Sequence, residues 1–222
     1  MVSKWSVAVA VPVLLACSSA ARAKTCVGQP SLSETHFNVG ANMRNVSQGR
    51  GFEGRAAIGN ARAFGGAMLG TIEYDKGTEL RSYIASISAG LSKKIGGSGG
   101  ICPMVAVEYE NGPDSFLVGQ AELSGFVGVA LGGVARVSET VGFVSFVSGG
   151  YQSIRTTSKY FDDPESRSYT DKGPAGAGGI GLLFKQQHLV RASANVPAIS
   201  VEGNVRPVYF LLGYSFSPSG GR

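Results

Sequence analysis

The strongest constraint on the fold is a two-residue alternation of apolar and polar side chains that recurs along the chain. In residues 122–131, for example, Leu123, Val127 and Leu131 alternate with Glu122 and Ser124. Successive side chains of a β-strand point to opposite faces, so each such segment has one apolar face and one polar or small face. The pattern predicts an all-β protein built from amphipathic strands.

Turn-forming residues, mostly glycine, asparagine and aspartate, separate the alternating segments. We predict a single antiparallel up-and-down β-barrel of ten strands over residues 35–216, with eight strands as the alternative because residues 53–62 do not alternate cleanly. The ten predicted strands are 35–46, 53–62, 65–75, 79–93, 101–110, 116–133, 139–155, 174–186, 188–198 and 206–216. Residues 217–222 form a C-terminal tail.

Composition excludes several other classes. Glycine accounts for 33 of the 222 residues without a three-residue period, which excludes collagen. Beyond the N-terminus no uncharged apolar run reaches the roughly 18 residues of a membrane helix. The net charge is +5, and no basic run or RNA-binding aromatic motif accompanies it, so we expect no nucleic-acid partner.

Residues 1–23 have the pattern of an export signal. Lys4 precedes an apolar stretch, and Ala21-Arg22-Ala23 offers a cleavage site before Lys24. The alternative is a lipoprotein signal, because residues 14–17 approximate a lipobox ending at Cys17. With cleavage before Lys24, residues 24–34 would be a periplasmic N-terminal segment. Cys26 and Cys102 remain after either cleavage, and an even number of cysteines in an exported chain favours a disulfide.

The alternation alone does not say which face is inside the barrel. In a soluble ligand-binding barrel the apolar face points inward, whereas in a membrane barrel it faces lipid. The polar faces here carry mainly serine, glycine, asparagine and alanine, which suit a crowded lumen. Aromatic residues near the strand ends suit a membrane girdle, for which we select Tyr74, Tyr83, Tyr109, Tyr151, Phe184, Tyr214 and Phe216.

The connections also favour a membrane barrel, because short periplasmic turns alternate with longer outer loops. The longest predicted connection runs from Arg155 to Gly173. We expect it to be the main recognition surface, with Lys159, Tyr160, Phe161, Asp162, Asp163, Arg167 and Tyr169 as its candidate residues.

Charged residues on the inward faces must pair, because an unpaired charge costs several kcal/mol to bury. We expect them to cross-link a largely plugged lumen, and the alternative is a small passive porin. The candidate network consists of Arg44, Glu73, Glu108, Glu122, Lys185, Arg191 and Asn195.

With these features in hand, the chain resembles small bacterial outer-membrane β-barrels of the OmpA-like or opacity-protein type. The resemblance rests on the export signal, the glycine-containing strands and the last strand, where Val208, Phe210, Leu212, Tyr214 and Phe216 alternate. It implies residence in outer-membrane lipid and recognition of that last strand by the barrel-assembly machinery. The tail after Phe216 departs from the family pattern.

Catalytic and metal-binding motifs are absent from the sequence. The two histidines, His36 and His188, fall at the predicted periplasmic strand ends, and a serine without a nearby general base is not activated. There is no CxxC, HExxH or EF-hand loop. We therefore expect a non-enzymatic protein without cofactor or metal, with a structural or surface-binding role.

Overall fold

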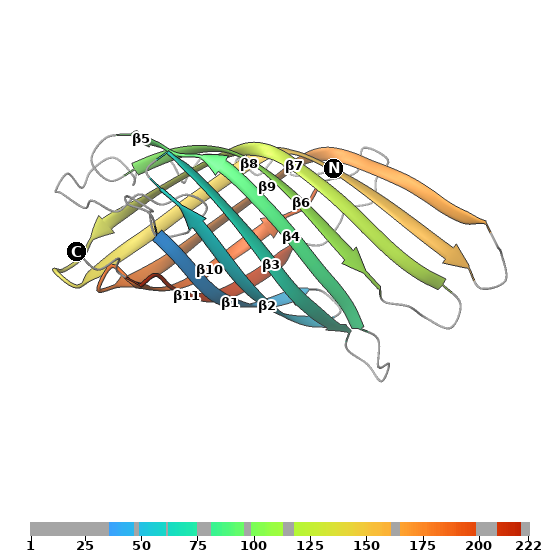
Figure 1. Cartoon of the computed structure of the whole chain (residues 1–222), viewed down its shortest axis with the longest axis horizontal. Coiled ribbons are helices and arrows are strands. Elements are labelled where there is room, and N and C mark those ends of the chain that lie inside the picture. The colour runs from blue at the N-terminus through green and yellow to red at the C-terminus, as the bar shows by residue number, and fades with distance from the viewer. Residues whose placement is uncertain are drawn as a thin grey trace, which may run out of the picture.

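The computed structural model describes residues 36–46, 49–60, 62–74, 81–95, 99–112, 118–160, 165–198 and 208–218. Its regular structure in these ranges is β-strand, arranged as a barrel (Figure 1). The strands are β1 (His36–Val46), β2 (Gly49–Gly59), β3 (Ala63–Tyr74), β4 (Arg81–Leu91), β5 (Lys93–Ile95), β6 (Gly99–Asn111), β7 (Val118–Arg136), β8 (Val141–Tyr160), β9 (Ser166–Phe184), β10 (His188–Val196) and β11 (Tyr209–Phe216).

The strands form one closed antiparallel ladder. Each strand pairs with the next one in the chain, except that β4 pairs with β6 instead of β5, and β1 pairs with β11 to close the ladder. The short β5 continues β4 in the same register, because Gly90 pairs with Met104 and Lys93 pairs with Ile101. The barrel therefore has ten strands, as predicted, and the doubtful second strand is present as β2.

The two ends of the barrel differ. The short connections between β2 and β3, between β7 and β8 and between β9 and β10 lie at one end, which we call the turn end, together with the start of β1 and the finish of β11. At the opposite end, the extended end, β7, β8 and β9 project beyond the other strands (Figure 1). Short periplasmic turns opposite longer outer elements are typical of outer-membrane barrels.

Apolar side chains cover the outside of the barrel. Val127 and Ile180 are 59% and 55% exposed, whereas Asn42 and Arg44 on the inward face are each 5% exposed. This is the orientation of a transmembrane barrel, and it contradicts the soluble alternative. Among the described residues, no helix has the length and apolar character needed to cross a membrane.

The two faces of strand β3 are exchanged relative to the prediction, which placed Tyr74 in the outer girdle and Glu73 in the lumen. Leu69 is 69% exposed on the outside and Ile72 is 2% exposed on the inside. Large apolar residues occur at both parities of this strand, so its own alternation is ambiguous. The pairing with β2 decides it, because Phe52 faces outward and lies opposite Thr71.

The predicted outer connection from Arg155 to Gly173 is also corrected. Most of it is strand, because β8 and β9 remain paired out to Lys159 and Ser166. A strand of 20 residues, tilted by about 40°, rises roughly 50 Å, well beyond a hydrocarbon layer of about 25 Å. Both faces of this projection are polar where it leaves the membrane, which explains why the apolar alternation failed to reveal it.

Inward glycines make room for aromatic rings that lie against the wall. The Phe126 ring covers Gly128 and Gly150, where an added Cβ would be 2.5 Å and 2.8 Å from its Cζ atom. The Phe146 ring covers Gly179 in the same way, and the Phe64 ring covers Gly90. The high glycine content thus serves interior packing.

Replacing Gly150 by alanine tests this packing, with the neighbouring Gly149→Ala as the matched control. A Cβ at Gly150 would lie 2.6 Å from the Cα of Gly128, whereas at Gly149 it would meet nothing within 4 Å. We expect Gly150→Ala to lower the unfolding free energy by about 1–3 kcal/mol and Gly149→Ala to leave it nearly unchanged. Urea unfolding of vesicle-reconstituted protein measures both; equal losses would contradict the packing account.

Candidate functional site: the barrel interior

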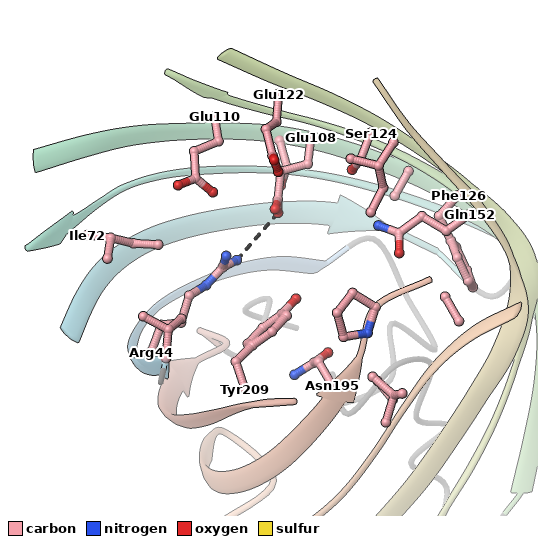
Figure 2. Close-up of a pocket in the computed structure, with 18 of the residues that line it drawn as sticks. Arg44, Ile72, Glu108, Glu110, Glu122, Ser124, Phe126, Gln152, Asn195 and Tyr209 are labelled. Carbon is pink, nitrogen blue, oxygen red and sulfur yellow. Dashed lines mark hydrogen bonds and ion pairs between the residues drawn. The ribbon is translucent and has the colours of Figure 1, made fainter. Parts of the chain in front are cut away.

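Arg44 is the centre of the interior polar cluster. It projects from the inward face of β1 and forms an ion pair with Glu53 of β2. Its Nη2 also lies 3.4 Å from a carboxylate oxygen of Glu108 on β6, so it bridges two separated parts of the wall (Figure 2). The guanidinium carbon lies 4.5 Å from the ring centroid of Tyr209, a cation–π geometry.

Asn42 connects this cluster to β10. Its Nδ2 donates to Glu53 at 3.1 Å, and its Oδ1 accepts from Nη2 of Arg191 at 3.3 Å. Gly213 of β11 lies between these groups, and a side chain there would collide with the Asn42 amide. A continuous polar chain therefore crosses β10, β11, β1 and β2 and ends on β6 through Arg44.

A cavity of about 630 Å³ lies in the half of the lumen nearer the extended end. Figure 2 shows side chains that line it. Three carboxylates line it, and Glu110 pairs directly across from Glu122 in the ladder between β6 and β7. Tyr74 donates to Glu110 at 3.0 Å, and Thr156 donates to Glu122 at 3.0 Å. The third carboxylate, Glu108, faces Arg44. This lining gives the cavity a negative character.

Two buried apolar clusters lie in the half of the lumen nearer the turn end, beside the buried polar groups of Asn38, Arg55 and Ser215. Cys102 and Ala130 are fully buried beside Phe64, and Met104 packs against them. A second buried cluster contains Val134, Val144, Leu183 and Leu189. The cavity therefore lies above packed apolar layers.

The structure places five of the seven predicted lumen residues inside the barrel. Arg44 and Arg191 belong to the polar chain, while Glu108, Glu122 and Asn195 line the cavity. The Nδ2 of Asn195 has no hydrogen-bond partner in the part of the chain that the structure describes.

Glu73 and Lys185 are not lumen residues. Because β3 is inverted, Glu73 faces outward and pairs with Arg81 at 2.8 Å, with both side chains more than half exposed. Lys185 lies past the end of β9 in the turn before β10, where its φ of 48° breaks the strand alternation.

Sequence reasoning missed Glu53, Glu110 and Tyr209 as interior polar residues. Glu53 begins the segment whose alternation was unclear, and Glu110 falls at the predicted end of its strand. The two-residue alternation did indicate Glu110, because Glu110 lies two residues beyond Glu108 and so shares its face. The alternation also placed Tyr209 on the face of β11 that points away from lipid. Neither signal gave the contacts that Arg44 makes.

Most predicted girdle residues are on the outside. Tyr83, Tyr109, Tyr151, Phe184 and Tyr214 are exposed, and Phe216 is partly exposed. Tyr74 is the exception, because the inversion of β3 directs it into the cavity, so its assignment to the girdle is wrong.

The predicted recognition residues are only partly described. Lys159, Arg167 and Tyr169 are exposed residues of β8 and β9 rather than of a loop, and Tyr160 ends β8. Phe161, Asp162 and Asp163 lie outside the described residues.

The residues on which the N-terminal predictions depend also lie outside the described ones. They are Cys17, Cys26 and the cleavage site before Lys24. Cys102 is buried on the inward face of β6. Its disulfide with Cys26 stays a prediction.

No arrangement for metal binding occurs within the described ranges, since no three His, Cys, Asp or Glu residues are placed to hold an ion. The His188 ring lies 2.7 Å from the Tyr214 hydroxyl, beside the turn at residues 185–187. What the interior offers chemically is charge and hydrogen bonding.

The closed wall, apolar exterior and ionic interior together define a small transmembrane β-barrel. No protein-family model and no curated protein matches the sequence. Among solved structures, Ail, the attachment invasion locus protein of Yersinia pestis, is similar over 84% of this chain and 99% of that one, with 13% identity and a TM-score of 0.44. The KdgM porin is similar over 81% and 98%, with 11% identity and a TM-score of 0.33.

The Arg44–Glu53 pair can be compared with the surface pair of Arg81 and Glu73. We expect Glu53→Gln to lower the unfolding free energy by about 3–5 kcal/mol, because it leaves a buried guanidinium with an incomplete counter-charge. Glu73→Gln removes an exposed pair and should cost less than about 1 kcal/mol. Urea unfolding in vesicles measures both. A Glu53→Gln protein as stable as Glu73→Gln would show that the interior cluster contributes little.

Proposed function

We propose that this protein is a bacterial outer-membrane β-barrel with a structural or surface-binding role, without enzymatic activity and without an open pore. The observation that carries the proposal is the division of the lumen. A polar cavity lies toward the extended end, and packed apolar side chains lie between it and the turn end.

The apolar half supports a closed lumen. Phe146 is 7% exposed and both Val144 and Leu189 are fully buried, so the layers near the turn end offer little space for a water column. Opening a continuous water path through these layers would require the side chains to separate, which would lose their packing energy. Small barrels of this size generally fill with side chains.

The projection of β7, β8 and β9 supports surface binding. Its length carries it beyond the membrane, and it presents exposed Arg167 and Tyr169 on the face that continues from the cavity wall. Tyr169 pairs across from Thr156, which itself bonds Glu122 of the cavity. Aromatic and arginine side chains on a rigid sheet are frequent anchors for partners.

The outer-membrane location and assembly route are part of the proposal. The outward row that leads into β11 and continues along it contains Val208, Phe210, Leu212 and Tyr214, all of them exposed. We propose that the barrel-assembly machinery reads this row and that the chain reaches it after export with the predicted signal.

A small passive porin is the second candidate, and the cavity favours it. The cavity of about 630 Å³ could admit small solutes, and the carboxylates of Glu108, Glu110 and Glu122 would favour cations. This candidate requires a path past the apolar layers.

Conductance across planar bilayers tests the two candidates. We expect the native protein to be silent at high protein loading, and Phe146→Ala/Leu189→Ala to open conductance steps by removing the closing side chains. The matched control, Val190→Ala/Leu212→Ala, removes apolar atoms from the lipid-facing side and should stay silent. Heat-modifiable gel migration verifies that each variant is folded. Steady steps from the native protein that Glu122→Gln alters would overturn the closed lumen and favour the porin.

A further inference from the structure

A row of basic side chains lies on the outside of β8 and β9, directly beyond the apolar surface. Tyr151 and Pro174 are paired outward neighbours, and both are exposed. Continuing toward the extended end, the next charged outward residues are Lys172, Arg155 and Lys159, all exposed. The pairing of β8 with β9 is unbroken through this region, so these side chains keep the outward orientation of Tyr151. We call these three residues the basic ladder.

Hydroxyl groups stand between the cations of the basic ladder. Thr170 pairs directly across from Arg155, and Lys172 is its diagonal neighbour, at a Cα separation of about 7–8 Å. Further along, the hydroxyls of Thr157 and Ser168 lie 3.0 Å apart on the same outward face. Guanidinium, ammonium and hydroxyl donors at this spacing suit the oxygen atoms of a phosphate group.

The opposite wall has a different charge arrangement. There, Glu73 pairs across from Arg50 and forms an ion pair with Arg81 at 2.8 Å. The described outward positions of β7, β8, β9 and β10 provide no such carboxylate beside the basic ladder. Among the described residues, none that pairs directly or diagonally with Arg155 or Lys172 in the ladder is a carboxylate, so the charge of these two residues is available to a ligand.

We propose that the basic ladder binds the phosphate groups of lipids in the membrane leaflet at the extended end. This inference rests on the proposed function, because it requires the barrel to lie in a membrane. Arg155 and Lys172 stand at the level where the apolar surface ends, which is where lipid headgroups begin. Long cationic side chains at that level reach the headgroups while their stems cover apolar surface.

Position favours lipid phosphate over free phosphate. The basic ladder is an exposed row on the outside of the barrel, so a free ion in water would keep most of its hydration and gain little. A lipid is already concentrated beside the wall, and only its headgroup has to align. Charge attraction of this kind is worth a factor of about five for each lysine or arginine near an anionic surface.

The test uses full-length protein reconstituted in phosphatidylcholine vesicles. Electron paramagnetic resonance of spin-labelled lipids then gives the association of phosphatidic acid relative to phosphatidylcholine at the barrel surface. We expect the native protein to prefer phosphatidic acid, and Arg155→Gln/Lys172→Gln to reduce that preference by up to about 25-fold, a factor of about five for each of the two cations. The matched control, Glu73→Gln/Arg81→Gln, also removes two charged groups but leaves the net charge unchanged, and it should keep the preference.

The outcomes separate this inference from the proposed function. Failure to insert into vesicles would overturn both. Normal insertion with equal association of the two lipids, or with the same preference in Arg155→Gln/Lys172→Gln, would overturn the basic ladder alone. Full competition by millimolar inorganic phosphate would also overturn it, because the site would then bind the free ion.

Discussion

The structure depends on one constraint, which is that every backbone hydrogen-bonding group within lipid must find a partner inside the protein. The chain satisfies it by closing the ladder, with β1 paired to β11 and β4 paired to β6. Closure fixes which face of each strand is inside. The apolar faces then meet lipid, and every charged side chain on the other face must be paired within the lumen. The ion pair of Arg44 with Glu53 is a direct consequence.

The two halves of the lumen accommodate their inward side chains in different ways. Nearer the extended end, arginine, glutamate and asparagine side chains share hydrogen bonds around a negatively charged cavity. Nearer the turn end, aromatic rings cover glycines such as Gly90 and Gly179, and two buried apolar clusters lie beside buried polar side chains such as Asn38 and Ser215. Glycines in the wall therefore leave space for the aromatic rings, and polar side chains on the same inward face provide the ion pairs.

The sequence predicted the barrel, its ten strands and the outward direction of residues such as Val127, because strict alternation shows which side chains share a face of the sheet. It failed where alternation carries no information. In β3, Met68 and Leu69 are both apolar, and only the pairing with β2 sets their faces. In the projection of β8 and β9 both faces are polar. The sequence pattern therefore predicts a loop from Arg155 to Gly173, where the structure has strands. Cross-lumen contacts such as Arg44 with Glu108 join residues 64 positions apart, and no local pattern specifies them.

The central claim is that the apolar faces meet lipid, and strand β3 gives its sharpest test. The only tryptophan, Trp5, lies within the predicted export signal, so Leu69→Trp and Met68→Trp each give the processed protein a single tryptophan. In vesicles containing brominated lipid, the account predicts strong quenching of Leu69→Trp fluorescence and little quenching of Met68→Trp. Strong quenching at position 68 together with protection at position 69 would contradict it.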